Sequence, residues 1–441
     1  MSTHDAHALS REEVLVGIDR PTAPILKTIS LILAAIGLIA FIIGLFLQPD
    51  RTWQSLLVNW LYFTSISSAG VMFVAVQRIT TARWSRPIIR FLEGYVAFLP
   101  VAFVLLLLII FFGKHHVFWW SNHTPEIHEK AIYLNPAFFF PRVVLIALTI
   151  TVLSLWYIYT SVRLDVGIVA ESGANWARGI RERMRRGFRD ERREIHSTHS
   201  LQGHLAVFLA FAFAFGWIVL SWDLSMSLDP HFQSTMYGWW FFMGGWVAAL
   251  ASWSLIVMAW RRYLGRYDMI QEKHFHDLGK LCFAFTAFWG YITFGQYLVI
   301  WYGNMGEETH WMRLRLIEGW RIPTLLAVGL MFVFPFFGLL SRAAKVFLPT
   351  FVLFASCTIV GLWITRYLEV YPSIYGVLSN VPLGLWEIGI TAGMLGIWGF
   401  CYLSFMDAFP RVHVLLMTSP YRDEVQVPVD PRTMEPLPAH E

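Results

Sequence analysis

The sequence predicts an all-α polytopic membrane protein with about ten transmembrane helices. Of its 441 residues, 56% are apolar and only 15% are charged, and the mean hydropathy is +0.52. This composition is unlike that of a soluble globular domain. Apolar runs of about 20 residues, the length that spans a hydrocarbon layer, recur along the chain. Lys and Arg gather in alternate connections, as expected for cytoplasmic loops.

Ten apolar runs are long enough to span a bilayer. They lie at 25–47, 56–77, 91–113, 138–160, 203–224, 236–260, 280–303, 322–341, 346–366 and 382–405. The first run is uniformly apolar, which predicts a peripheral, lipid-facing helix. Residues 1–24 are polar and acidic, and no small-residue cleavage site follows the first run, so we expect a retained cytoplasmic tail and not a signal peptide.

The connections predict the orientation, because short cytoplasmic loops collect Lys and Arg. Arg-rich connections follow the second, fourth, sixth and eighth runs, and the connections between them are neutral, mixed or acidic. Both termini are therefore expected in the cytoplasm, including a tail at 406–441. The basic loop 163–202 has acids interleaved among its arginines. This pattern is typical of an amphipathic helix on the lipid surface and does not favour nucleic acid.

Several chemistries are excluded by residues that the chain lacks. The two Gly-Lys pairs are followed by His115 and Leu281, so no phosphate-binding loop is present. Cys282, Cys357 and Cys401 are widely separated, which excludes a CxxCH haem attachment and an iron–sulfur cluster held by this chain alone. None of the 15 histidines falls deep inside a predicted span. We therefore expect no haem, no metal and no other cofactor bound by this chain alone.

Ionisable and hydroxyl side chains inside the spans are candidates for a proton path, because they exchange or orient protons through bound water. The candidates near the cytoplasmic side are Glu93, His204 and Asp407; those near the outer side are Asp223 and Glu387; Tyr291, Thr293 and Gln296 lie between. No catalytic residue is predicted. A competing interpretation places Asp223, Arg366 and Glu387 around a quinone head group.

Some of these residues have equally simple structural roles. Glu93 lies one helical turn from Arg90, so an ion pair competes with a relay role. His204 and Asp407 lie close enough to the cytoplasmic edge to stay hydrated. Asp229 precedes Pro230, a common start of a helix, and is better explained as an N-cap. Asp223 is therefore the better functional candidate in this segment.

Glu387 is the hardest acid to explain as a surface residue. The same predicted helix carries Gly389 and Gly393 in a GxxxG spacing, which favours close packing against another helix. Close packing would bury Glu387. A pair with Arg366 would make it structural, whereas an unpaired carboxyl would suit a proton carrier, and both alternatives stay open.

Two long stretches carry a resemblance to a known family. They are WDLSMSLDPHFQSTMYGWW, residues 222–240, and HDLGKLCFAFTAFWGYITFGQYLVIWYGNMGEETHW, residues 276–311. Both resemble an NrfD-like membrane subunit of alternative complex III, a bacterial quinol oxidoreductase. That complex has two paralogous NrfD-like subunits. The stretches resemble the one to which proton transfer is ascribed, and the quinol-oxidising paralogue is the nearest alternative.

The resemblance implies a fold, a location and partners. It implies two four-helix bundles, at 56–224 and 236–366, flanked by the first helix and by a last helix at 382–405, in the bacterial inner membrane. It also implies a multihaem cytochrome c, an iron–sulfur protein, a monohaem cytochrome c and a second NrfD-like subunit as partners, which would hold the haem and the iron–sulfur clusters.

The sequence thus predicts a haem-free, non-catalytic subunit of a quinol oxidoreductase that delivers electrons to a cytochrome c or a copper protein. It would anchor the complex among membrane lipids and conduct protons. One alternative is a quinone-binding NrfD-type subunit, with quinol as a possible ligand, of this or a related molybdopterin-type complex. Another is a standalone secondary transporter, whose substrate site would lie at broken helices near the midplane.

Overall fold

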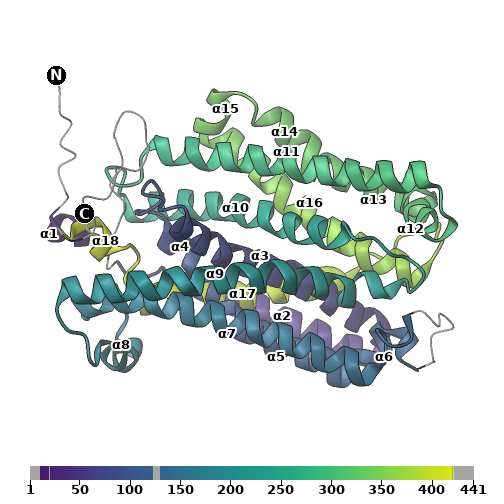
Figure 1. Ribbon diagram of the computed structural model, residues 1–441, viewed down its shortest axis with the longest axis horizontal. Coiled ribbons are helices and arrows are strands. Elements are labelled where there is room, and N and C mark those ends of the chain that lie inside the picture. Colours follow the sequence, from purple (N-terminus) through teal and green to yellow (C-terminus); the bar gives the residue numbers. More distant parts are fainter. Residues whose placement is uncertain (1–9, 19, 123–129, 420, 422–441) are drawn as a thin grey trace, which may run out of the picture.

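A computed structural model describes residues 10–18, 20–122, 130–419 and 421. Within these residues every regular element is a helix, and ten helical stretches are long and apolar enough to cross a membrane. The predicted all-α polytopic fold is confirmed (Figure 1). Most of the expected tail at 406–441, from residue 422 onward, lies outside the described residues, as do residues 1–9 of the N-terminal tail.

The ten stretches correspond to the ten predicted runs. They are α2 (Pro24–Leu47), α3 (Pro49–Ile79), α4 to α6 (Ile89–Val117), α7 (Pro136–Ile168), α9 (Glu191–Leu224), α10 (Tyr237–Leu264), α11 (Glu272–Gly303), α13 to α14 (Glu318–Gly338), α16 (Leu348–Tyr375) and α17 (Leu385–Ala408). The shorter helices are α1 (Arg11–Leu15), α8 (Arg178–Arg185), α12 (Gly306–Leu316), α15 (Arg342–Val346) and α18 (Val414–Thr418). Several spans extend past their predicted ends, and this extension proves important for the buried charges.

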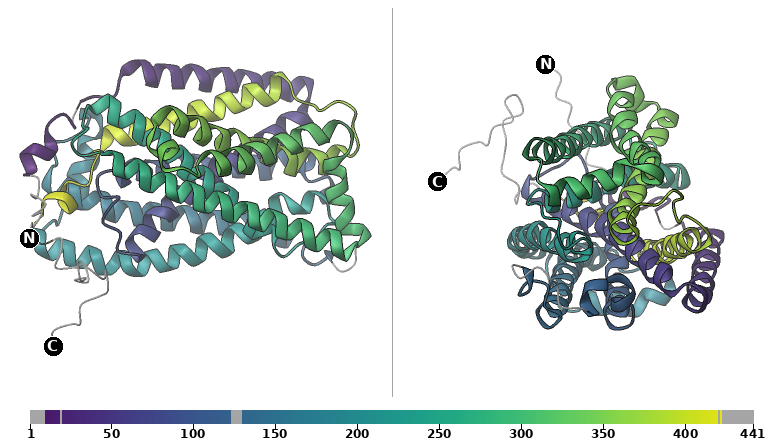
Figure 2. Two further views of the ribbon diagram at one scale, coloured as in Figure 1. Left: turned by 90° about the horizontal axis from the view of Figure 1, so that it is seen from above. Right: turned by 90° about the vertical axis from the view of Figure 1, so that its right-hand side faces the viewer.

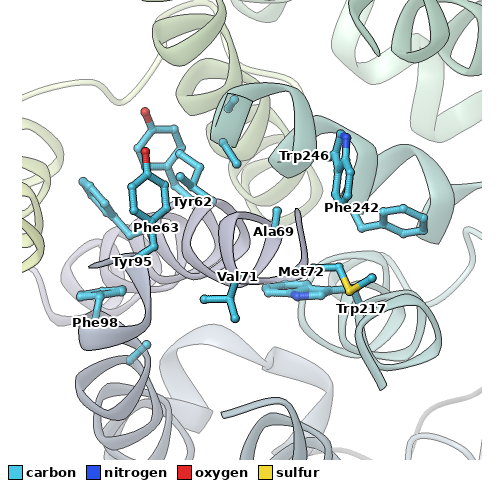
Figure 3. Close-up of a cluster of buried hydrophobic side chains, with 14 of the residues drawn as sticks. Tyr62, Phe63, Ala69, Val71, Met72, Tyr95, Phe98, Trp217, Phe242 and Trp246 are labelled. Atoms are coloured by element: carbon cyan, nitrogen blue, oxygen red, sulfur yellow. The ribbon is translucent and has the colours of Figure 1, made fainter. Parts of the chain in front are cut away.

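Two helices form the centre of the molecule. α3 packs against α7, α9, α10, α16 and α17, and α10 packs against α9, α11 and α16. Because neighbours surround α3, its most apolar segment is buried on all sides. Figure 3 shows Tyr62, Phe63 and Met72 of this helix among aromatic side chains of the adjoining helices. These aromatic rings fill the space between α3 and its neighbours.

The first span lies at the edge of the molecule, as predicted. α2 packs along α17 and contributes mostly exposed apolar side chains (Figure 2). The two backbones approach closely at one point, where a Cβ atom added to Gly393 would lie 2.5 Å from the Cα of Gly37. The close packing expected from the Gly389 and Gly393 spacing is therefore confirmed, and any larger residue at Gly393 would push the helices apart.

The two ends of the helical assembly differ in charge. The Arg-rich connections that follow α3, α7, α10 and α14 lie at one end, together with α1, α8 and α18; we call this the basic end. α6 and α12 lie at the other, which we call the opposite end (Figure 1). The basic loop is largely helical: α8 ends before Gly187, whose φ is +75°, and α9 begins at Glu191, earlier than predicted.

The helix start expected at Asp229 is wrong. α10 begins at Tyr237, and its N-cap position is Met236. Asp229 instead follows the short 3₁₀ turn Met226–Leu228, and its backbone carbonyl accepts from the Phe232 amide. Tyr237, the first residue of the helix, is buried and its ring packs against Phe232 and Trp311.

Candidate functional site

A buried group of ionisable side chains lies near the basic end, between α4, α7 and the segment that follows α17. We call Arg90, Glu93, Ser161, Asp165 and His413 the Glu93 cluster. Arg90 is ion-paired with both carboxylates, Glu93 through one terminal nitrogen and Asp165 through the other. All three charged side chains are at most 1% exposed. Burial of this kind requires the charges to be paired and hydrogen-bonded.

Glu93 has two further partners on its other oxygen. Ser161 Oγ donates to Glu93 Oε1 over 2.7 Å, and His413 Nε2 lies 3.0 Å from the same oxygen. His413 Nδ1 lies 3.7 Å from Asp165 Oδ2. The imidazole therefore stands between two carboxylates, and a proton on either ring nitrogen faces a negative oxygen.

The charge balance of the Glu93 cluster depends on one proton. One guanidinium faces two carboxylates, so the cluster carries a net negative charge when His413 is neutral and no net charge when it is protonated. A net charge is costly to bury.

The chain after the last span brings His413 into the cluster. Arg411 holds this segment in place: its guanidinium donates to the Met406 and Ile18 carbonyls and to Asp407 Oδ1 over 2.7 Å. Just beyond the histidine, the Leu415 amide donates to Asp165 Oδ1 over 2.8 Å. The segment is therefore folded back onto the basic end and is part of the packed structure.

A polar cavity of about 100 Å³ adjoins the cluster. It is lined by residues of the Glu93 cluster and by Gln77, Arg78, Ser85, Arg86, Tyr157, His199 and Gln202. A cavity of this volume with several polar partners has room for water. Because Ser85 and Arg86 belong to the connection after α3, the cavity links Glu93 with the basic end.

A row of hydroxyls continues from the cluster toward the middle of the assembly. Thr151, Ser154, Ser161 and Asp165 lie on one face of α7, because their helical angles fall within about 80° at 3.6 residues per turn. All four are buried. Beside them, a cavity of about 10 Å³ reaches Thr64 and Thr151, which is close to the lower limit for a single water. The space near Glu93 therefore has room for water, whereas the space in the middle has room for about one water at most.

At the opposite end, Asp223 is held by one arginine. Arg142 Nε and NH2 donate to its two carboxylate oxygens over 3.0 and 2.7 Å, and the guanidinium also lies 4.0 Å from the centre of the Tyr133 ring. Burial, reinforced by the neighbouring carboxylate, raises the pKa of Tyr133. The pair is matched one to one, and both carboxylate oxygens of Asp223 accept from the guanidinium.

Glu387 is held in the same way, but not by Arg366. Arg51 NH2 donates to its Oε2 over 2.7 Å, Tyr371 OH donates to Oε1 over 2.9 Å, and the Gly384 amide donates to Oε2 over 2.8 Å. Through the last bond, Glu387 at N3 satisfies the backbone amide of the N-cap residue Gly384 at the start of α17. Of the two sequence-based alternatives, the structural one describes its geometry.

Arg366 belongs to a third ion pair. Its NH1 donates to Glu369 Oε1 over 2.7 Å, and both side chains are 1% exposed. The three residues of the quinone hypothesis, Asp223, Arg366 and Glu387, therefore each have a separate partner. The quinone-binding role stays a prediction.

The remaining sequence candidates are dispersed. Asp407 pairs with Lys27 over 2.6 Å and with Arg411, and joins α17 to α2. His204 is exposed, with Nδ1 2.9 Å from the Ser200 carbonyl. Tyr291 lies on the surface, 70% exposed. Their part in a proton path stays a prediction that no contact with the Glu93 cluster supports.

Thr293 and Gln296 line a separate cavity near the opposite end. Thr293 donates to the Trp289 carbonyl over 2.7 Å and accepts from Trp240 Nε1 over 3.0 Å. Gln296 is only 5% exposed. The structure places these two residues together but does not bring them to the Glu93 cluster.

Comparison with known proteins does not assign the site. No protein-family model matches the chain, and no curated protein matches it. The function is therefore inferred from the geometry of the described residues and from the resemblance of the two stretches at 222–240 and 276–311.

Proposed function

We propose that the chain is a haem-free membrane subunit of a quinol oxidoreductase of the alternative complex III type, and that it moves protons through the Glu93 cluster. The chain alone would not be an enzyme. The observation that carries the proposal is a buried carboxylate pair that shares one arginine and one histidine beside a polar cavity. Such an arrangement favours proton uptake, because one added proton cancels the net negative charge of the cluster.

The direction of proton access follows from the positions of the parts. The polar cavity joins Glu93 with the basic end, which the positive-inside pattern assigns to the cytoplasm. Protons would enter there, exchange on His413 and Glu93, and stop at the narrow region near Thr64 and Thr151. This arrangement is a half-path, so transfer to the opposite side would require hydration or movement of the middle region.

Proton flux in proteoliposomes tests this function. The full-length chain, with the subunits that co-purify with it, is reconstituted around a pH-sensitive dye, and quinol turnover drives the flux, because the narrow middle region would block passive flow. Glu93→Gln is expected to lower the flux at least tenfold, because the amide cannot take up a proton. Glu387→Gln is the matched control, since it changes a buried carboxylate that is already paired. Equal flux in wild type and Glu93→Gln would remove the proposal.

The assignment to a complex has its own test. Subunits containing c-type haem and iron–sulfur clusters are expected to co-purify with the chain from its native membrane, and their haem bands are expected to be absent from spectra of the isolated chain. A chain that purifies alone, with no redox partner, would contradict the assignment. Genes for such subunits beside this one would support it.

A secondary transporter is the second candidate, and one observation favours it. π-helical turns interrupt the third span at Ile109–Gly113 and the eighth span at Gly329–Val333. Interrupted helices in both halves of a membrane protein are typical of transporter substrate sites. A solute gradient coupled to proton flux would support this candidate, whereas flux that needs only the redox partners would favour the oxidoreductase subunit.

A further inference from the structure

The cavity beside Gln296 lies apart from the Glu93 cluster, and its size and lining are those of a ligand pocket. It measures about 360 Å³ and lies between α10, α11, α12, α13 and α16. Six aromatic side chains line it: Trp240, Trp289, Phe294, Tyr297, Trp311 and Phe332. Pockets for small molecules range from about 300 to 1,000 Å³ and are mostly apolar with a few polar groups.

Gln296 is the polar group that a ligand would satisfy. The side chain is 5% exposed and lines the cavity, yet its amide makes no hydrogen bond with any other described residue. Thr293, one turn away, has both of its hydrogen bonds within the chain. Because the amide lines the cavity and is not hydrogen-bonded to another described residue, it offers a donor and an acceptor to a ligand oxygen.

The charged residues of the cavity are already engaged. Arg315 donates to three backbone carbonyls and to Ser373 Oγ. Burial lowers the pKa of Arg315 to about 10, so the guanidinium stays charged at neutral pH. Glu369 is ion-paired with Arg366 through Oε1 over 2.7 Å, whereas its Oε2 has no hydrogen-bond partner among the described residues. Because the carboxylate already faces a cation and the Arg315 guanidinium is hydrogen-bonded, neither charge needs a charged ligand, and the cavity favours an uncharged one.

The cavity also reaches the apolar surface of the molecule. Phe294 of α11 and Leu316 of α12 line it and are 62% and 38% exposed. Val328 of α13 also lines it and is partly exposed. An amphiphile in the surrounding bilayer therefore has a lateral route into the cavity that does not cross water.

We propose that this cavity binds one uncharged amphiphile from the bilayer. Its carbonyl or hydroxyl oxygen would bond to the Gln296 amide, and its apolar chain would pack on Trp289 and Phe332. A neutral glycerolipid and an isoprenoid quinone share this chemistry. The site differs from the residues of the quinone hypothesis, and the inference does not depend on proton transfer at the Glu93 cluster.

Equilibrium binding to the full-length chain in nanodiscs tests the inference. The two probes are tritiated dioleoylglycerol and tritiated decylubiquinone, and they distinguish the two sources. Ala327→Phe places a ring into the cavity and is expected to weaken binding more than tenfold. Leu325→Phe is the matched control, because Leu325 lies on the same helix, is 58% exposed and does not line the cavity.

Gln296→Leu tests the head group separately. The substitution keeps the approximate size of the side chain and removes one hydrogen bond, so the dissociation constant is expected to rise roughly fivefold. If Ala327→Phe fails to fold, binding to Gln296→Leu decides whether the site exists. Saturable binding of either probe that is lost in Ala327→Phe and kept in Leu325→Phe supports the site and identifies the source.

Two results would overturn the inference. One is the absence of saturable binding for both probes. The other is an affinity that is unchanged in Gln296→Leu and equal in the two phenylalanine variants, which would indicate non-specific partition into the bilayer. The variants lie far along the chain from Glu93, and none belongs to the Glu93 cluster, so this inference and the proton-transfer proposal can fail separately.

Discussion

The Glu93 cluster and the Arg51–Glu387 pair are both buried and both contain a carboxylate and an arginine, yet their charge balance differs. Glu387 has its own arginine, a tyrosine hydroxyl and a backbone amide. Glu93 shares Arg90 with Asp165 and needs His413 to complete the balance. Burial alone therefore does not mark a functional carboxylate. An unmatched charge count beside a polar cavity is the more informative feature.

The largest expected effect concerns stability at the opposite end. Arg51→Met leaves the Glu387 carboxylate buried without its cation, and breaking a buried pair in this way costs about 3–5 kcal/mol. We expect the lower end of this range, because Arg51 is partly exposed. Thermal unfolding in detergent measures the effect.

A double replacement distinguishes the loss of the ion pair from the cost of burying one unpaired charge. Arg51→Met combined with Glu387→Met is expected to recover much of the lost stability, since no uncompensated charge remains. Proton flux should survive in the double variant. A flux that disappears with the stable double variant would place the opposite end in the proton path and remove the functional contrast between the two sites.

An intermediate effect is expected from a hydroxyl in the Glu93 cluster. Ser161→Ala removes one hydrogen bond to Glu93 Oε1 and should cost about 1 kcal/mol of stability. Proton flux should fall several-fold, because Glu93 Oε1 then keeps only its contact with His413, which holds the exchangeable proton in position less well. The control is Ser254→Ala, which removes a buried hydroxyl bonded to the Leu250 carbonyl. Equal flux in the two variants would contradict the role of the cluster.

The smallest effect is expected at an exposed ion pair of the basic end. Hydrogen bonds from Arg266 lower the pKa of Asp268. A carboxyl with a lowered pKa stabilises the folded chain above its ordinary pKa, and this contribution is lost as the pH falls below about 3.9. Since the side chain is 56% exposed, Asp268→Asn should cost less than about 1 kcal/mol at neutral pH. Unfolding curves at neutral and acidic pH measure this change in the free energy of unfolding. A larger loss would show that charges at the basic end stabilise the fold more than their exposure to solvent implies.

The fold was predictable from the sequence because apolar runs are long and charges cluster in the connections. The ten runs, the peripheral α2 and the close packing of α17 against another helix were visible in local composition, whereas the identity of that helix as α2 was not. The ends of the helices were less predictable. α3 begins seven residues earlier than the predicted start at 56, and α16 continues nine residues beyond the predicted end at 366.

These misplaced ends explain why the sequence did not reveal the ion-pair partners of Glu387 and Arg366. Arg51 and Glu369 fall just outside the predicted spans, because ionisable residues lower the hydropathy of a window. In the structure they lie within helices, since each has an opposite charge that offsets its burial. Glu369 was detectable in principle, as it lies three residues after Arg366 in a helical pattern.

The Glu93 cluster was predictable only in part. The Arg90 and Glu93 pair follows from helical spacing, and its ion-pair interpretation is confirmed. Asp165 and His413 come from distant parts of the chain, and His413 follows the last span in a segment that sequence assigns to a tail. Long-range pairing of this kind has no local signal in a single sequence.

The Glu93 cluster is proposed to exchange a proton, whereas the Arg51–Glu387 pair is not, and infrared spectroscopy can distinguish the two. Difference spectra of the purified chain between two pH values are recorded for wild type, Glu93→Gln and Glu387→Gln. A buried carboxyl or imidazole signal should appear in wild type, persist in Glu387→Gln and disappear in Glu93→Gln. A signal that persists in Glu93→Gln and disappears in Glu387→Gln would reverse the assignment of the two sites.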